Sequence, residues 1–188
     1  SLKSIGMVVG RNVSFPHEHG KRHVIQEMCF SKSGKLVVGS YDDDDDDDDG
    51  AENISVWDPE DWSCIGRLTA GNINVYSVCP VGDKIAVGAF DTIQIWDVDS
   101  MEMTMEIPTD AGEFILSLCV DSNGMIISGD SRGAVKVWNP ATGQLIRVMP
   151  LGHTFNNDAV RLFAIIGQNS TVTSLALDQN GLVVSASD

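Results

Sequence analysis

Eight consecutive aspartates, Asp42–Asp49, are the residues whose type and spacing most directly suggest chemistry in this chain. Carboxylate oxygens are the ligands that calcium prefers, and the segment Asp45-x-Asp47-x-Asp49-Gly50 begins like the calcium-binding loop of an EF-hand. The twelfth position of such a loop should be a bidentate glutamate, and here it is Val56. A block of like charges is more typical of a solvated, self-repelling loop, which sometimes binds a basic partner. The sequence therefore disfavours a defined calcium site.

A second candidate for chemistry is the segment "HEHGKRH", which contains His17, His19 and His23. Imidazole nitrogens bind transition metals, but the spacing of these histidines matches no established structural zinc pattern. The chain also has no G-x-S-x-G, no phosphate-binding loop ending in Lys-Ser/Thr, no H-E-x-x-H and no G-x-G-x-x-G. We therefore expect no cofactor, no bound metal and no catalysis.

The composition narrows the class of partner. Hydrophobic residues make up 43% of the 188 residues, as in an ordered globular protein. The formal net charge of −15, eight of it from the aspartate run, argues against binding to the phosphates of DNA or RNA. No apolar run approaches the roughly 20 residues that span a bilayer, and the start of the chain has too little positive charge for a signal peptide. We expect a cytoplasmic protein, with the nucleus as the other location, that does not insert into membranes.

An internal repeat emerges when the chain is aligned with itself. Trp57, Trp96 and Trp138 lie 39 and 42 residues apart. Each unit predicts an apolar first strand, a Gly-bearing turn, a second strand rich in Val and Ile, a third strand ending in Trp, and a short fourth strand. Units of roughly 40 residues with four short antiparallel strands indicate the blades of a β-propeller. The aligned segments are "MCFSKSGKLVVGSYD…NISVWD", "VCPVGDKIAVGAFDTIQIWD", "LCVDSNGMIISGDSRGAVKVWN" and the beginning of a fourth, "LALDQNGLVVSASD".

The repeat explains three of the four cysteines. Cys29, Cys79 and Cys119 occupy one register of the first strand, where Ala176 stands in the fourth unit. Neither CxxC nor CxxH occurs, and free Cys packs as a small hydrophobic residue. We expect reduced thiols that pack inside the fold.

The units, above all the portions "GS-x-D" and "I-x-VWD", resemble the WD-repeat family over residues 24–188. The resemblance implies an all-β, WD-repeat β-propeller with about three and a half blades of four-stranded antiparallel sheets, part of a larger propeller of about seven blades. The expected division of this single partial domain, 1–188, is an N-terminal strand and lead-in loop (1–23), blades at 24–70, 71–109 and 110–151, an insertion loop (152–171) and the start of an incomplete blade (172–188).

The resemblance also implies a hydrogen-bonded set of His, Ser, turn Asp and Trp in many blades. The match is partial: His19 or His23 could supply the His of the first unit, and Arg132 stands where the turn Asp of the third unit would be. The matching residues are Ser40, Asp42, Trp57, Asp91, Trp96, Trp138 and His153.

Three departures from the plain repeat fall on connections that the resemblance places on one face of the disc. They are the aspartate run, the insertion Thr154–Ser170 and the lead-in loop "FPHEHGKRH". Loops on a rigid scaffold are where binding function usually resides. The candidate partner face therefore comprises His17, His19, Lys21, Arg22, His23, Asp43, Asp45, Asp47, Asp49, Arg132, Asp158, Arg161 and Phe163.

The basic lead-in loop and the aspartate run belong to the same blade, so we expect them to be neighbours. Nearby carboxylates would then raise the pKa of the histidines above the ordinary value. The alternative is two mobile loops that share a face without touching. The insertion "NNDAVRLFAIIG" is interpreted as a short helix or an extra strand packed on its own propeller, or else as an exposed partner site.

The predicted function is a non-catalytic scaffold or adaptor that binds other proteins within a multi-subunit assembly, with a basic segment as a candidate ligand of the acidic loop and no direct nucleic-acid contact. Two alternatives stay open. One is the substrate-recognition module of a ubiquitin ligase, and the other is the targeting domain of a larger kinase.

Overall fold

The computed structural model describes residues 23–42, 54–68, 74–149, 155–157, 160–164, 171–177 and 182–186. Every regular element in these residues is a β-strand, and none forms a helix that could cross a membrane. The strands are β1 (His23–Phe30), β2 (Leu36–Asp42), β3 (Ile54–Trp57), β4 (Cys64–Leu68), β5 (Ser77–Val81), β6 (Lys84–Gly88), β7 (Thr92–Asp97), β8 (Glu102–Pro108), β9 (Ile115–Val120), β10 (Ile126–Asp130), β11 (Val135–Trp138), β12 (Leu145–Met149), β13 (Phe155–Asn157), β14 (Val160–Ala164), β15 (Ser174–Leu177) and β16 (Leu182–Ala186).

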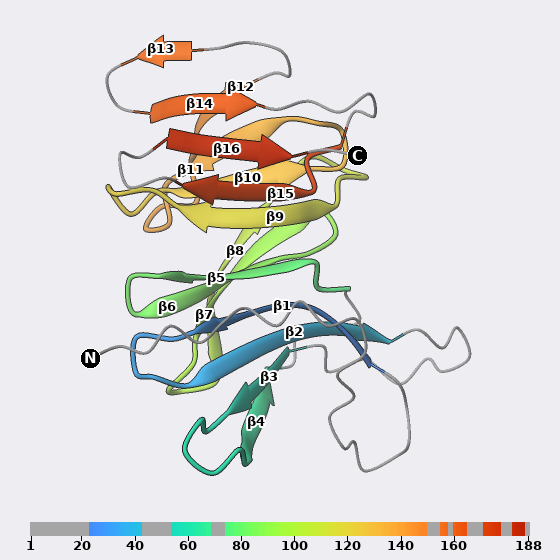
Figure 1. Ribbon diagram of the computed structural model, residues 1–188, viewed down its shortest axis with the longest axis vertical. Coiled ribbons are helices and arrows are strands. Elements are labelled where there is room, and N and C mark those ends of the chain that lie inside the picture. The colour runs from blue at the N-terminus through green and yellow to red at the C-terminus, as the bar shows by residue number, and fades with distance from the viewer. Residues whose placement is uncertain are drawn as a thin grey trace.

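The strands form four four-stranded sheets that follow one another along the chain. The first three are antiparallel and run in sequence order, β1 to β4, β5 to β8 and β9 to β12. Their first strands lie side by side, β1 against β5 and β5 against β9, and β15 of the fourth sheet lies against β9. Figure 1 shows the sheets stacked in this order, with β1 to β4 at one end of the molecule and β13 to β16 at the other. This arrangement is that of successive propeller blades around an axis lined by the first strands.

The fourth sheet has a different topology from the first three. Its order is β13-β14-β16-β15, and β14 pairs in parallel with β16. The strands β13 and β14 come from the segment predicted as an insertion, and they precede the inner strands in sequence. This segment thus occupies the two outer positions that β11 and β12 occupy in the third sheet.

Apolar side chains hold neighbouring sheets together. One buried cluster joins Val37 and Val56 of the first sheet to Val78 of the second. A second cluster joins the second and third sheets, and a third joins Ile127 of the third sheet to Leu175 of the fourth. Burying one such side chain contributes about 1.5–3 kcal/mol, so each sheet is stabilised mainly by its neighbours.

A glycine in the second strand lets the next sheet approach. A Cβ on Gly39 would lie 2.8 Å from Val75 Cγ1, and one on Gly88 would lie 2.8 Å from Ile115 Cγ2. Val172 lies in the same way over Gly129. Because side-chain contacts this short do not occur, the Gly of the repeat is required by close packing between sheets.

The Asp or Asn after each repeat tryptophan caps the turn to the fourth strand. Asp58 Oδ1 accepts the Glu60 amide at 2.8 Å, and Asp97 Oδ1 accepts the Asp99 amide at 2.9 Å. Asn139 does the same in the third sheet. The turn then ends in a left-handed residue, which is Trp62, Met101 or Gly143. The Trp-Asp pair is therefore a strand end followed by an Asx turn.

The cysteines lie where the repeat predicts. Cys29, Cys79 and Cys119 pair with Val37, Ala86 and Ile127 on the second strands, and all are free thiols. Burial raises the pKa of Cys29 and of Cys119 to about 12, so both are uncharged near neutral pH.

Candidate interaction face

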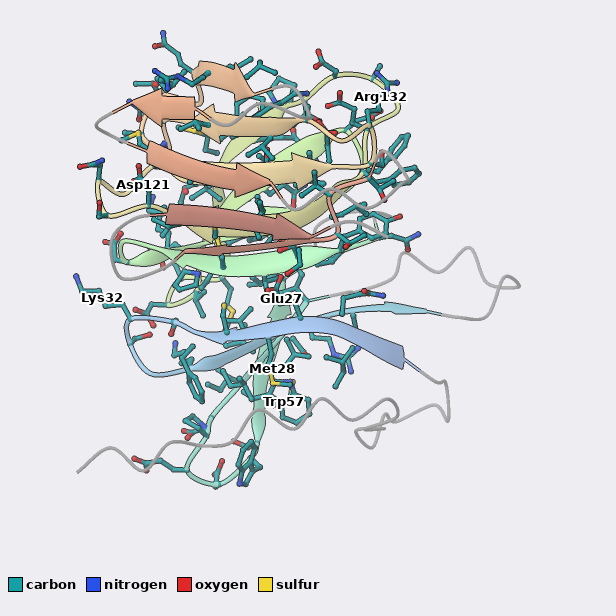
Figure 2. All side chains as sticks on the ribbon, turned by 45° about the horizontal axis from the view of Figure 1, so that its top comes forward. Glu27, Met28, Lys32, Trp57, Asp121 and Arg132 are labelled. Carbon is teal, nitrogen blue, oxygen red and sulfur yellow. The ribbon has the colours of Figure 1, made fainter. Side chains whose placement is uncertain are left out.

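The two ends of the sheets carry different kinds of turn. Figure 2 shows Lys32 and Asp121 at one end, where the first strand of a sheet turns into the second, and Arg132 at the other. The second end carries the turns from second to third strand and the loops that lead into the next sheet. We call this end the Arg132 face; its described residues include Tyr76, Phe90, Asp91, Asp110 to Phe114 and Asp130 to Arg132.

Asp91 holds the loop that leads from the second sheet into the third. Its Oδ1 accepts the amides of Gly112 at 2.5 Å and Glu113 at 3.0 Å. Its own amide donates to the Glu113 carbonyl at 2.8 Å. The residue has a φ of 57°, in the left-handed region that Asp tolerates better than most side chains. Asp91, chosen from the sequence as a turn aspartate, thus acts across a sheet boundary.

A buried lysine holds the same loop from inside. Lys136 Nζ donates to Glu113 Oε2 at 2.6 Å and to Asp110 Oδ2 at 2.8 Å, and it lies 3.4 Å from Asp130 Oδ2. The side chains of Lys136 and Glu113 are each 4% exposed. Burial acts to lower the pKa of Lys136, but the hydrogen bonds to Asp110 and Glu113, together with the negative charges of Asp130 and Glu113, raise the pKa overall. The hydrogen bond from Lys136 also lowers the pKa of Asp110. The charged form of this lysine is therefore stable inside the fold.

The presence of Lys136 changes which residue accepts the hydrogen bond from the indole N–H of the repeat tryptophan. In the first two sheets the tryptophan Nε1 donates to the residue two positions earlier, Trp57 to Ser55 at 2.8 Å and Trp96 to Gln94 at 3.1 Å. The equivalent residue in the third sheet is Lys136, which has no acceptor. Trp138 Nε1 instead donates to Ser128 Oγ on β10 at 2.8 Å. The residues paired with Ser55 and Gln94 on the second strands are valines, which offer no side-chain acceptor. Each of the three sheets therefore has one side-chain acceptor for its tryptophan, either on the third strand or on the second.

Arg132 contacts the lead-in loop from the solvent side. Its Nη2 donates to the Ala111 carbonyl at 2.7 Å, and its Nη1 lies 3.8 Å from Glu113 Oε1. The side chain stays 57% exposed. The turn that carries it is held by Asp130 Oδ1, which accepts the amides of Arg132 and Ala134. The residue predicted for the partner face is therefore exposed and also fixes the loop beside it.

Three aromatic rings lie together on the Arg132 face. The rings of Phe90 and Phe114 are 5.0 Å apart, and those of Tyr76 and Phe114 are 5.4 Å apart at nearly a right angle. The side chain of Phe90 is 42% exposed and that of Phe114 is 37% exposed. We call these rings the aromatic platform. The repeat pattern does not identify these rings, because each lies just outside a strand and the alignment of the units depends on the apolar residues within the strands.

A second set of hydrogen bonds connects the first strands around the axis. Glu27 Oε2 accepts the Ser77 hydroxyl and, at 3.0 Å, the Val78 amide of the next sheet. Ser77 Oγ accepts the Leu118 amide at 2.9 Å, and Ser117 Oγ accepts the Leu175 amide at 2.9 Å. Figure 2 shows Glu27 between β1 and β5. Burial raises the pKa of Glu27 although both hydrogen bonds lower it.

This second set could have been found from the alignment. Glu27, Ser77 and Ser117 pair with Gly39, Gly88 and Gly129, so they share one register. The signal is a polar residue recurring inside an apolar strand.

For several of the predicted residues, the structure gives the position on a strand and the residue paired with it or its burial. His23 begins β1 and pairs with Asp42 at the end of β2, so the end of the lead-in loop and the start of the aspartate run are adjacent. Arg161 and Phe163 lie on β14, opposite Leu182 and Val184 of β16. Ser40 is buried at the end of β2, and Trp96 and Trp138 are buried. Outside the described residues lie His17, His19, Lys21, Arg22, Asp43, Asp45, Asp47, Asp49, His153 and Asp158.

Among the residues that the structure describes, no group of three or more His, Cys, Asp or Glu side chains is arranged to hold a metal ion. The carboxylates of Asp110, Glu113 and Asp130 instead surround Lys136. This cluster can fix a loop and define a surface.

Comparisons with known proteins agree with the architecture. No protein-family model matches the chain. It is similar to the U3 small nucleolar RNA-associated protein 4 homolog of Mus musculus, with 28% identity over a match of 158 residues. The match covers 78% of this chain and 21% of that protein.

Solved structures with a similar fold include the extracellular domain described as a hybrid two-component system from B. thetaiotaomicron. Its TM-score is 0.58 at 15% identity, over 85% of this chain and 20% of that one. A second structure, of an extracellular domain described as a one-component system from the same organism, has a TM-score of 0.56 at 16% identity. The chain thus spans about a fifth of the length of the proteins it matches. With the four sheets described above, these similarities confirm the predicted fold: the described sheets are those of an all-β, partial β-propeller.

Proposed function

We propose that this propeller segment is a non-catalytic scaffold that binds other proteins within a multi-subunit assembly, and that the Arg132 face is its contact surface. The observation that carries the proposal is the aromatic platform. Phe90 and Phe114 keep 42% and 37% of their surface exposed, although the residues next to them in the chain, Ala89 and Ile115, are fully buried. Exposed aromatic rings on a well-held backbone are typical of interface centres.

The similarity to a small nucleolar RNA-associated protein supports the class of function. A protein with that name works in company with other macromolecules in the nucleus, and we propose the same environment for this chain. The formal net charge of −15 favours a protein partner over direct contact with the RNA itself.

Hydroxyl-radical footprinting tests the contact surface. The 188-residue chain, tagged and recovered with its assembly from nuclear extract, would be compared with the chain alone. We expect Phe90 and Phe114 to be protected in the assembly. Leu145 and Ile146 on the outer strand β12 are 45% and 55% exposed and serve as the matched control. Protection of these two with unchanged labelling of the two phenylalanines would place the contact surface elsewhere.

A further inference from the structure

The aromatic platform is built as a rigid surface. The Phe114 amide donates to Ser131 Oγ at 3.1 Å, and the Ser131 amide donates to the Phe114 carbonyl at 3.0 Å. Phe114 also forms a β-bridge with Phe90, which joins the second sheet to the third. The backbone of both rings is therefore fixed before any partner arrives, and binding has little conformational entropy to lose there.

The loop before Phe114 is fixed at three points. Asp91 accepts its amides, Lys136 binds its carboxylates, and Arg132 binds its Ala111 carbonyl. Because Arg132 and Lys136 both direct their charge into this loop, neither extends free toward a ligand over the rings.

The charge around the platform is acidic. Asp110 lies in the lead-in loop with 71% of its side chain exposed, and Asp91 lies next to Phe90 in sequence. The described titratable groups of this junction are Asp91, Asp110, Glu113, Asp130, Arg132 and Lys136, which carry four negative and two positive charges.

We propose that the aromatic platform binds an arginine- or lysine-rich segment of a partner protein, with a cationic side chain over the faces of Phe90 and Phe114 and a further cation near Asp110. The inference rests on the proposed function and names the partner class for that face. An aromatic ring face attracts a cation, and surrounding carboxylates add electrostatic steering. A nucleic acid could stack on the rings, but its phosphates would meet the same carboxylates.

Fluorescence anisotropy with a labelled Arg/Lys-rich peptide tests this on the 188-residue chain. We expect saturable binding that weakens as salt is added, and a loss of about tenfold in affinity for the double variant Phe90→Ala, Phe114→Ala. Met103→Ala is the matched control, because Met103 is 45% exposed on the outer strand β8. Unfolding midpoints measured in urea for all variants establish that each remains folded. A chain lacking Asp43–Asp49 should bind with a smaller dependence on salt, because its net charge is less negative.

Three results would overturn the assignment: no saturable binding of the basic peptide, equal binding by the double phenylalanine variant, or stronger binding of a single-stranded RNA than of the peptide. The footprinting experiment separates this failure from failure of the proposed function. Protection of Phe90 and Phe114 in the assembly without peptide binding would leave the scaffold function in place and remove only the basic partner.

Discussion

The first and second sheets contain the same number of strands in the same order, but among the described residues only the second sheet has another sheet against each of its faces. Met28 and Val78 occupy the same register of their first strands, opposite Val38 and Val87. Met28 is 51% exposed and Val78 is 1% exposed. Trp57 is half-buried, and its equivalent Trp96 is 4% exposed. Figure 2 shows Met28 and Trp57 on the side of the first sheet that faces away from β5.

The turn to the fourth strand shows the same contrast. Met101 of the second sheet lies over Gly66 of the first, with its Cε 3.4 Å from the place of a Cβ. Trp62 holds the equivalent position in the first sheet and is 61% exposed. Met101 and Trp62 are both apolar, so their difference in exposure comes from what packs against each sheet. The open face of the first sheet has the composition of a face that packs against another sheet.

Substitution of Val78 and of the equivalent Met28 by aspartate should give the largest difference in the free energy of unfolding. Val78→Asp places a charge in the cluster between the first two sheets and should lower the free energy of unfolding by about 4 kcal/mol or more. Met28→Asp should change it by no more than about 0.5 kcal/mol in this chain. Urea denaturation of both variants measures the contrast. A large loss for Met28→Asp would show that the first sheet is covered in solution.

The role of Lys136 in the third sheet can be tested by replacing it with glutamine, the residue (Gln94) at the equivalent position of the second sheet. Lys136→Gln introduces the residue that the second sheet has at this register, and it leaves Glu113 and Asp130 buried without their cation. We expect a loss of about 3 kcal/mol in unfolding free energy. Lys35→Gln is the control, since Lys35 forms a more exposed 2.8 Å ion pair with Asp99 and should cost less than about 1 kcal/mol. Equal effects would contradict a structural role for the buried cluster.

Two glycines with different surroundings test how tightly neighbouring sheets pack. Gly88→Ala would place a methyl group 2.8 Å from Ile115 Cγ2 and 2.9 Å from its carbonyl oxygen, and should cost about 1–3 kcal/mol. Gly66→Ala meets only the flexible end of Met101 and should cost clearly less. The shift in thermal unfolding midpoint ranks the two. The reverse ranking would mean that the sheets separate easily.

The smallest expected effect concerns Glu27, which stands where the next two sheets have serine. Its pKa is raised in the folded protein, so the stability it contributes is complete below about pH 4.5 and is lost as the pH rises through the raised value. Glu27→Gln should remove this pH dependence and become the more stable variant toward neutral pH. Denaturation of both proteins across this pH range measures the difference. Parallel curves would contradict the burial of the carboxylate.

The sequence was sufficient for the first three sheets because their period, their tryptophans and their turn residues are set by local rules. Asp91 was predicted as a turn residue and lies between β6 and β7, but its bonds to Gly112 and Glu113 depend on contact between sheets. Lys136 was missed because a lysine on a strand is usually solvated. The hairpin of β13 and β14 differs again, since its pairing with β16 is parallel and depends on residues that follow it in the chain.

The bonds from Glu27, Ser77 and Ser117 to the amides of the next sheet have a consequence for assembly. Each sheet presents a side-chain acceptor on one side and an amide donor on the other, so the ring has a direction. The residue of the first sheet in register with these donor amides is Met28, and the residue of the fourth sheet in register with the acceptors is Ser174. Two copies meeting through identical faces would place donor against donor. A further sheet that repeats this pattern would therefore join head to tail, in one rotational sense.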